Sequence, residues 1–166
     1  MNFDEFRRQF PRKLQDIKDF VNGDEVKDII GVEAVNHFKE SFQNEGFTDE
    51  TLNPWKDVQR RNPSSTWFGH SGQTGRKSDA RKSAKILSGE TLELQNAITY
   101  RRIPGGARIS NDKPYASVHN YGGQAKIYGK KGFTMPKRQF IGRSAVLVNN
   151  INNKIKRRLI GILKTN

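Results

Sequence analysis

The chain has 166 residues, the size of one domain, and holds no run of 18 apolar residues that could cross a membrane. Leu, Ile, Val and Phe supply 39 of the 166 residues, so the hydrophobic core is expected to be thin. The sequence contains no cysteine, which excludes disulfides, thiolate metal sites and a cysteine nucleophile. Its first residues lack the apolar region of a secretory signal, so we expect a cytoplasm-like compartment.

The net charge of +13 is distributed unevenly along the chain. Residues 1–55 carry 7 basic and 12 acidic groups (net −5), whereas residues 56–166 carry 23 and 5 (net +18). A basic chain favours nucleic-acid binding, while an acidic head on a basic body also suits a protein that contacts its own copies or an acidic protein surface. Charge alone does not distinguish these classes.

Residues 1–54 are predicted to be helical and acidic. Apolar residues at steps of three and four form a first stripe of Phe3, Phe6, Phe10, Leu14, Ile17 and Val21. Pro11 predicts a break or kink near Phe10, and Asn22-Gly23 predicts the end of this helix. A second helix, with Asp24 as expected N-cap, ends before Gly46 and carries the stripe Val26, Ile29, Ile30, Val35, Phe38 and Phe42. We expect both stripes to form core.

Residues 55–85 are predicted to be a long basic loop. After Trp55 the only large apolar residues are Val58, Trp67 and Phe68, while eight cations are present: Lys56, Arg60, Arg61, Arg76, Lys77, Arg81, Lys82 and Lys85. Such a stretch cannot build a core of its own. A loop of this length in a compact domain is usually functional, or ordered only when a partner binds it.

A β-hairpin and a short helix are predicted within residues 86–121. Leu92, Leu94, Ile98 and Tyr100 alternate at period two, and Pro104-Gly105-Gly106 turns the chain into Ala107-Arg108-Ile109. The segment from Tyr115 to Tyr121 is expected to be helical or irregular.

Residues 122–138 are predicted to be a second basic loop, and residues 139–166 a C-terminal helix. Gly122-Gly123 opens the loop, which has four glycines, five cations and no acid. The helix carries the stripe Ile141, Ala145, Val148, Ile151, Ile155, Leu159 and Ile162, with cations near its end that suit the helix dipole. We expect the stripe to pack on the protein's own sheet; insertion into a membrane surface is the alternative.

No arrangement of residues predicts catalysis. GHSGQTGRKS (residues 69–78) differs from a phosphate-binding loop because Arg76 separates Gly75 from Lys77 and no predicted strand precedes it. The three histidines, His37, His70 and His119, lack metal-ligand spacing, and the carboxylates after residue 56 are scattered. We therefore expect a protein that is not an enzyme and holds no metal and no cofactor.

Four short motifs follow one another along residues 38–144. They are Phe42 through Gly46-Phe47 to Pro54-Trp55, then Ile86-Leu87 ahead of residues 91–99, then Tyr115-Ala116 with His119 and Gly122-Gly123, and finally residues 135–142, MPKRQFIG. In this order the motifs resemble the phage virion morphogenesis family of tail-completion proteins of Mu-like phages and prophages. The chain departs from the family pattern at Thr91-Leu92, where the family usually has Thr-Gly, and its first basic loop is longer than expected.

The resemblance implies an α+β fold in which N-terminal and C-terminal amphipathic helices pack on a small antiparallel sheet, with two long basic loops. It also implies a structural virion protein of the neck or head-proximal tail, in tail completion or head–tail joining. Such a protein assembles in the bacterial host cytoplasm as an oligomeric ring, contacts other neck or tail proteins and needs no membrane. The motif residues are expected to be structural: Trp55, Tyr115, His119, Gly122, Gly123, Pro136, Arg138 and Phe140.

The alternative function is non-specific nucleic-acid binding. The residues expected to contact a partner or nucleic acid are Arg60, Arg61, Arg76, Lys77, Arg81, Lys82, Lys126, Lys130 and Lys131, with Trp67, Phe68, Tyr128 and Phe133 as stacking candidates. Both functions are compatible, because a neck protein lies near packaged DNA. The charge split further predicts a head-to-tail ring in which the acidic helices of one copy lie against a basic loop of the next. Neutralisation of these charges within one chain is the alternative.

Overall fold

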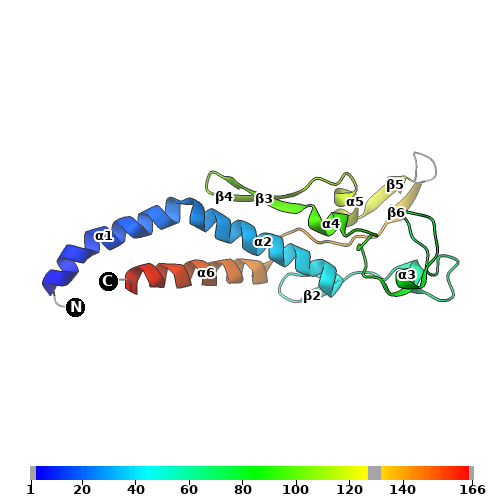
Figure 1. Cartoon of the computed structure of the whole chain (residues 1–166), viewed down its shortest axis with the longest axis horizontal. Coiled ribbons are helices and arrows are strands. Elements are labelled where there is room, and N and C mark those ends of the chain that lie inside the picture. Colours follow the sequence, from blue (N-terminus) through cyan, green and yellow to red (C-terminus); the bar gives the residue numbers. More distant parts are fainter. Residues whose placement is uncertain (1–2, 127–131, 165–166) are drawn as a thin grey trace.

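The molecule is elongated, with both termini at one end, and helix α2 (Asp24–Asn44) forms its axis (Figure 1). The computed structural model describes residues 3–126 and 132–164. Helix α1 (Phe3–Asn22) precedes α2, and α6 (Ala145–Lys164) runs beside both of them. We call α1 together with residues 155–164 of α6 the helical arm.

Helix α1 is continuous through Pro11, so of the predicted break or kink near Phe10 the break is wrong. A proline removes one backbone hydrogen bond, but the turns on either side continue the ladder here. The helix ends at Asn22, as predicted. Gly23 then joins α1 to α2 in an extended conformation, and a Cβ atom at this position would lie 2.5 Å from the carbonyl oxygen of Asp19.

Helix α2 starts at Asp24, whereas the prediction of Asp24 as N-cap placed the first helical residue at Glu25. Gly23 occupies the N-cap position and makes no side-chain cap, so Asp24 is the first helical residue and its assignment as N-cap is wrong. Asp24 and Glu25 in the first turn still favour the positive end of the helix dipole. The helix ends at Asn44, and Glu45 follows with a left-handed φ of 52°.

Within the described residues the strands form three separate antiparallel pairs, so the α+β class is confirmed but the predicted single sheet is divided. Hairpin β1 (Gly46–Thr48) with β2 (Leu52–Pro54) lies inside the segment predicted to be helical. Hairpin β5 (Gly123–Lys126) with β6 (Gly132–Met135) lies inside the predicted second basic loop. Period-two patterns of three or four residues were too short to reveal either pair.

The predicted central hairpin is present as β3 (Ile98–Ile103) and β4 (Gly106–Asn111), with a turn at Pro104 and Gly105. The strand does not extend back to Leu92, because residues Glu93–Asn96 form the short helix α4. Leu94 and Ile98 are both buried, and their spacing of four residues also suits a helical turn. Helix α5 (Ala116–Tyr121) confirms the predicted short helix.

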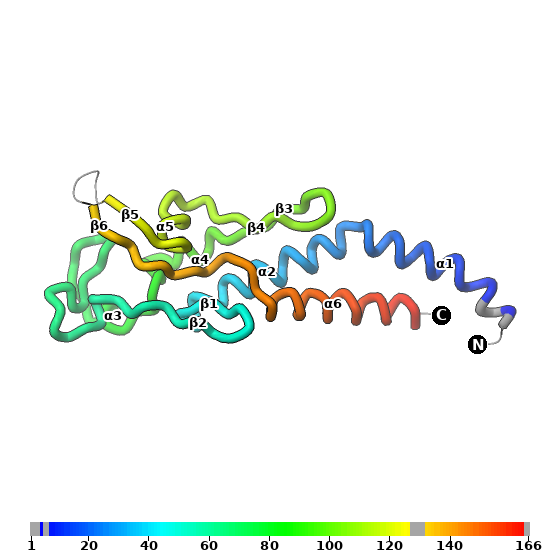
Figure 2. The backbone as a smooth tube through the Cα atoms, turned by 180° about the vertical axis from the view of Figure 1, so that it is seen from behind, coloured from blue at the N-terminus to red at the C-terminus, as the bar shows by residue number. Residues whose placement is uncertain are grey.

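The C-terminal helix begins later than predicted. Residues 136–144 run back along the molecule from β6 to α6, and α6 starts at Ala145, so Ile141 precedes the helix (Figure 2). Asp49 accounts for this start, since its carboxylate accepts a hydrogen bond of 2.8 Å from the backbone N–H of Ala145.

The core is centred on Phe42 of α2. Its ring centroid lies 5.6 Å from that of Trp55 and 5.2 Å from that of Phe140. The Trp55 indole N–H donates a 2.7 Å hydrogen bond to the carbonyl of Gln139. These contacts join the end of α2, the strand pair β1–β2 and the returning segment 136–144.

The predicted loop 55–85 is a folded lobe held by arginine side chains. It contains a 3-10 turn, η1 (Gln59–Arg61), and the short helix α3 (Asp79–Ser83). Arg60 donates to the carbonyls of Arg81 and Lys85 at 2.7 and 2.9 Å, and Arg61 donates to the Ala84 carbonyl at 2.7 Å. We call residues 56–91 the arginine-held lobe. Hydrogen bonds from guanidinium groups take the place of the apolar core that this stretch cannot build. They explain how residues 56–91 are ordered within a single chain.

The lobe is tied to α2 by the ion pair of Arg61 and Glu45. The two side chains share a bidentate contact with about one fifth of each exposed, and Glu45 also accepts the N–H of Ile86 at 2.7 Å. The hydrogen bond from Arg61 lowers the pKa of Glu45 below its ordinary value, against the effect of burial.

We expect Arg61→Met to reduce the free energy of unfolding by about 2–3 kcal/mol, because it leaves a half-buried carboxylate without its partner. Urea denaturation at pH 7 measures this loss. The pKa of Glu45 is depressed in the folded state, so its contribution is present above the ordinary value of 4.5 and disappears as the pH falls through the folded pKa. Arg76→Met, at an exposed position, is the control; equal losses in both variants would contradict the assignment.

Candidate functional site

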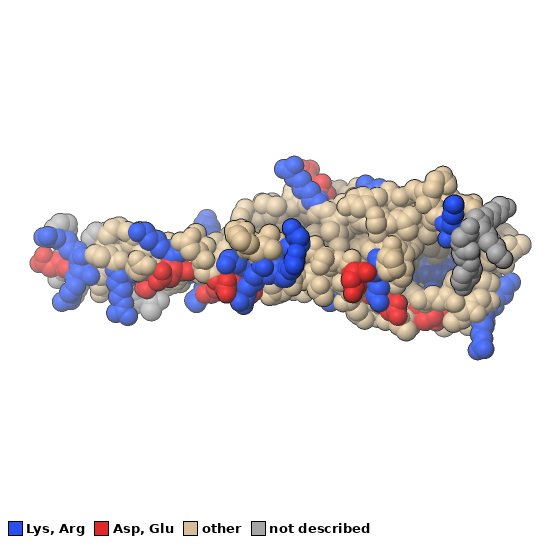
Figure 3. Space-filling model, turned by 90° about the horizontal axis from the view of Figure 1, so that it is seen from above, with Lys and Arg blue, Asp and Glu red and all other residues tan. Residues whose placement is uncertain are grey.

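A cleft of about 510 Å³ lies between the arginine-held lobe, helices α4 and α5, and strand β6. Apolar side chains form much of its wall: Val58, Leu87, Leu94, Phe133 and Met135. Arg60, Arg81, Tyr115 and His119 also line it. Figure 3 shows this end of the molecule hollowed, with cationic side-chain atoms visible within the hollow. We call this cavity the lobe cleft.

His119 enters the cleft from α5 as a neutral side chain. Burial, and then the charge of Arg138, lower the pKa of His119 to about 4, so the imidazole ring is uncharged at pH 7. Its Nδ1 atom is buried and has no hydrogen-bond partner among the described residues. The Tyr115 ring meets the His119 ring edge-on, with centroids 6.0 Å apart.

Positive charge accumulates on the lobe side of the cleft. Arg81 donates one hydrogen bond of 2.5 Å to the carbonyl of Gly89, but its Nε atom is buried, lies 3.7 Å from the Glu90 carboxylate and makes no hydrogen bond within the described ranges. Arg60 has no carboxylate hydrogen-bonded to it in the same ranges. Burial, then the charges of Arg81 and Arg61, lower the pKa of Arg60 to about 10.

The structure divides the nine cations predicted to contact a partner. Arg60, Arg61 and Arg81 donate to carbonyls of their own lobe and so hold it together, but Arg61 also pairs with Glu45, and the Arg81 Nε atom has no hydrogen bond among the described residues. Arg76, Lys77 and Lys126 are exposed, and Lys82 pairs with Asp79 and lies 5.0 Å from the centre of the Phe68 ring. Lys130, Lys131 and Tyr128 lie outside the described residues.

Most of the motif residues have structural positions. Trp55 and Phe140 are core, and the buried Arg138 donates two hydrogen bonds to the carbonyl of Lys56 at 3.0 and 3.1 Å. Gly122 has a φ of 74°, and a Cβ there would lie 2.9 Å from the backbone nitrogen of Lys137. The remaining positions in this set are Gly123, exposed with a φ of 120°, and Pro136, half-buried.

Sequence reasoning missed two features of this region. The buried Asn120 accepts hydrogen bonds from the N–H groups of Phe140 and Ile141 and donates to the Ile141 carbonyl, so it joins α5 to the returning segment. Leu87 has a left-handed φ of 60° at the cleft wall. Because Asn120 directly follows His119 in the motif, the sequence could have indicated that Asn120 has a structural role. Nothing in the sequence predicts the left-handed backbone angle of Leu87.

Four acidic residues of α2 are paired with cations of the same chain. Arg102 of β3 binds Asp28 at 2.6 Å and Asp24 at 2.8 Å, while Glu33 and Glu25 pair with Lys154 and Arg158 of α6. These four carboxylates follow the alternative that the sequence left open, neutralisation within one chain, while the predicted contact between an acidic helix and a basic loop of the next copy stays a prediction.

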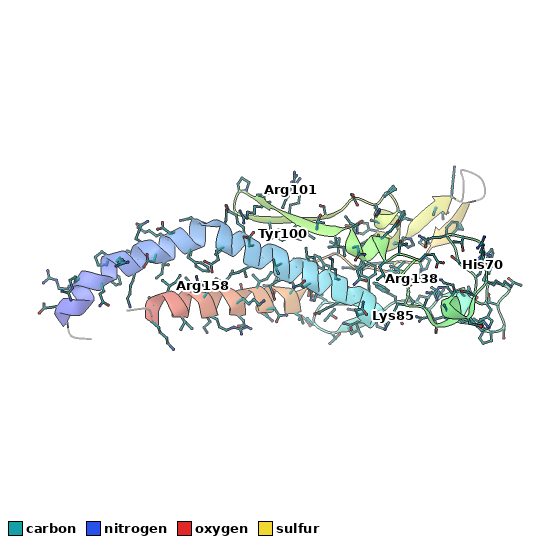
Figure 4. The ribbon with its side chains drawn as sticks, in the orientation of Figure 1. His70, Lys85, Tyr100, Arg101, Arg138 and Arg158 are labelled. Atoms are coloured by element: carbon teal, nitrogen blue, oxygen red, sulfur yellow. The ribbon has the colours of Figure 1, made fainter. Side chains whose placement is uncertain are left out.

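Two exposed arginines remain on the outer face of the central hairpin. Arg101 and Arg108 are directly paired across β3 and β4, and no hydrogen bond or ion pair of either side chain occurs in the described part of the chain. Figure 4 shows Arg101 directed away from α2, whereas Tyr100 lies between the hairpin and α2. Like charges placed opposite each other destabilise a strand pair, so this face suits an anionic partner.

The lobe cleft is equipped for binding. The Ser71 hydroxyl contacts Glu90 and accepts hydrogen bonds from the N–H groups of Gln73 and Thr74 at 3.3 Å, so it stabilises a turn.

In residues 3–126 and 132–164, no three His, Asp or Glu side chains gather as metal ligands. No described helix is long and apolar enough to span a bilayer. Apolar walls beside the unpartnered Nε–H group of Arg81 fit an apolar side chain next to an anionic or carbonyl oxygen.

We expect His119→Gln to weaken the pH dependence of stability. The folded protein holds the His119 pKa at about 4 against an ordinary value of 6.5, so the unfolded chain binds more protons between these values. Stability therefore falls as the pH drops through this window, by about 2 kcal/mol between pH 7 and pH 5. Urea denaturation at both pH values measures the difference. His70→Gln is the control that keeps it; an unchanged slope in His119→Gln would refute the assignment.

Comparison with known proteins places the site within a family. The profile of the phage virion morphogenesis family matches residues 53–160, which include the arginine-held lobe, the residues that line the lobe cleft and most of α6. Helices α1 and α2 lie outside the matched range. No curated protein and no solved structure matches the chain. Because the profile covers well over half of the sequence and includes most of the motif residues, the chain belongs to the phage virion morphogenesis family.

Proposed function

We propose that the protein is a structural subunit of the neck or head-proximal tail of a phage virion, active in tail completion or head–tail joining. It works as a homo-oligomeric ring that contacts other neck or tail proteins after assembly in the bacterial host cytoplasm. Membership of a virion morphogenesis family supports the virion role. The observation that carries the oligomeric part is the apolar surface that a single chain leaves open on the helical arm.

The helical arm exposes apolar residues of both of its helices, and those of α1 belong to the first predicted core stripe. Phe10, Leu14 and Val21 of α1 are 49%, 41% and 51% exposed, and Ile160 and Leu163 of α6 are 39% and 50% exposed. The prediction that the first stripe is entirely core is therefore wrong for a single chain. Helices gain most of their stability from burying an apolar face, so this arm is built to pack against another molecule.

The arm is held together mainly by its own two helices. The Lys13 ammonium donates a 2.6 Å hydrogen bond to the Leu163 carbonyl, joining α1 to the last turns of α6. The arm therefore presents a surface made by two helices. All of α1 and residues 161–164 of α6 lie outside the family-matched range.

We expect Leu14→Asp to leave the subunit folded and to prevent its incorporation into particles, because the change places a charge on the exposed stripe without opening a core cavity. Cryo-electron microscopy of particles, with the subunit counted and located, is the measurement. Arg12→Asp, exposed on a different face of α1 from Leu14, is the matched control and should incorporate normally. A subunit found as isolated copies, or away from the neck and the head-proximal tail, would contradict the proposal.

Contact with DNA is the second candidate function, favoured by the paired Arg101 and Arg108. We expect weak, sequence-independent binding that depends steeply on salt, because cations that contact phosphates displace counterions. Replacing both arginines by serine should lower the slope of log affinity against log salt by about 2. The control replaces Lys156 and Arg157 on α6 by serine. An unchanged slope in the hairpin variant would remove this face as the contact.

A further inference from the structure

The lobe cleft has the chemistry of a receptor for a short peptide segment. Its walls are largely apolar, its volume of about 510 Å³ exceeds that of one leucine side chain, and Arg60 and Arg81 place positive charge beside it. The buried Arg81 Nε and His119 Nδ1 atoms both lack a hydrogen-bond partner in the described structure. The Arg81 Nε–H group is a buried donor without an acceptor, which is costly, so the fitting occupant carries an apolar side chain next to a carboxylate.

One segment of this chain presents that combination on a turn. Leu52 is 46% exposed at the start of β2, and Glu50 is exposed two residues earlier, with no hydrogen bond or ion pair to its carboxylate within residues 3–126 and 132–164. Leu14 has Asp16 at the same spacing, but positions two apart on a helix point to different faces. We call residues 49–52 the β1–β2 turn.

The β1–β2 turn is held rigidly by its neighbours. The Asp49 carboxylate accepts the N–H of Ala145 at 2.8 Å, and its carbonyl accepts the N–H of Val146 at 3.1 Å. The Asn53 side-chain amide donates to the carbonyls of Thr51 and Phe47 at 3.2 and 3.3 Å. A turn that is already ordered loses little entropy on binding, so Leu52 and Glu50 are preorganised to insert.

The turn and the cleft of one chain lie on different parts of the molecule. Figures 1 and 2 both place hairpin β1–β2 on the side of α2 opposite to α5 and hairpin β5–β6. The turn therefore reaches a cleft on another copy. A contact between two unlike surfaces of identical chains is heterologous, and it closes into a ring when its rotation allows.

We propose that the β1–β2 turn of one copy docks in the lobe cleft of the next, with Leu52 against the apolar wall and the Glu50 carboxylate beside Arg60 and Arg81. This inference rests on the proposed oligomeric function and names the contact that would build it. In the ring this contact acts beside the apolar surface of the helical arm. The residues that line the cleft lie inside the family-matched range, and the β1–β2 turn immediately precedes it.

Cross-linking tests the contact directly, because the chain has no cysteine of its own. Leu52→Cys chains are mixed with Gly72→Cys chains, Gly72 being a cleft residue where an added Cβ meets nothing within 4 Å. A short bismaleimide should join the two variants into a covalent dimer far more efficiently than either variant alone. Gly106→Cys replaces Gly72→Cys in the control, since Gly106 lies in equally open space on the central hairpin. Equal cross-linking to both positions, or none, overturns the proposal.

A charge-neutral variant provides the second measurement. We expect Glu50→Gln to weaken self-association at least about tenfold in sedimentation equilibrium, with Glu40→Gln, an exposed carboxylate on α2, as the unchanged control. Equal association constants for both variants would overturn the assigned role of Glu50. Cryo-electron microscopy separates the two hypotheses: a ring in the particle without the cross-link rejects this contact alone, whereas absence from the particle rejects the proposed function.

Discussion

The packing of Trp55 and Phe140 against Phe42 is the interaction on which the rest of the molecule depends. It places the end of α2, the strand pair β1–β2 and the segment 136–144 at one point. From that point the lobe extends in one direction, while the returning segment leads back to α6 and the helical arm. The two ends of the molecule thereby present different surfaces: an open cleft at one and an exposed apolar arm at the other.

The thin core is supplemented by arginines that bind backbone carbonyls. Arg60, Arg61 and Arg138 each donate to carbonyl groups of chain that lacks apolar side chains of its own. A planar guanidinium offers several donors in a rigid arrangement, so it can order irregular backbone that would otherwise be left without partners. Part of the strong positive charge is therefore structural. Beside the lobe cleft, Arg81 lies 3.7 Å from the Glu90 carboxylate, whereas Arg60 has no carboxylate hydrogen-bonded to it within the described residues.

The internal ion pairs of α2 change how association is understood. The bonds of Arg102, Lys154 and Arg158 to the acidic residues of α2 orient the central hairpin and α6 on that helix. Exposed pairs of this kind contribute only about 0–1 kcal/mol each. They neutralise Asp24, Glu25, Asp28 and Glu33 within the chain, whereas the carboxylates of Glu40 and Glu50 stay exposed.

The sequence by itself determined the α+β class, most of α2 and α6, the β3–β4 hairpin, α5 and the family, because these depend on local periodicity, turn residues and motif order. Only the tertiary structure decided that Arg60, Arg61 and Arg81 bind carbonyls, that α1 leaves its stripe exposed, and that Tyr115, His119 and Arg81 line one cleft. The reason is physical. Periodicity records which face of an element is apolar, whereas the partner of a cation and the cover of an apolar face depend on segments distant in the chain.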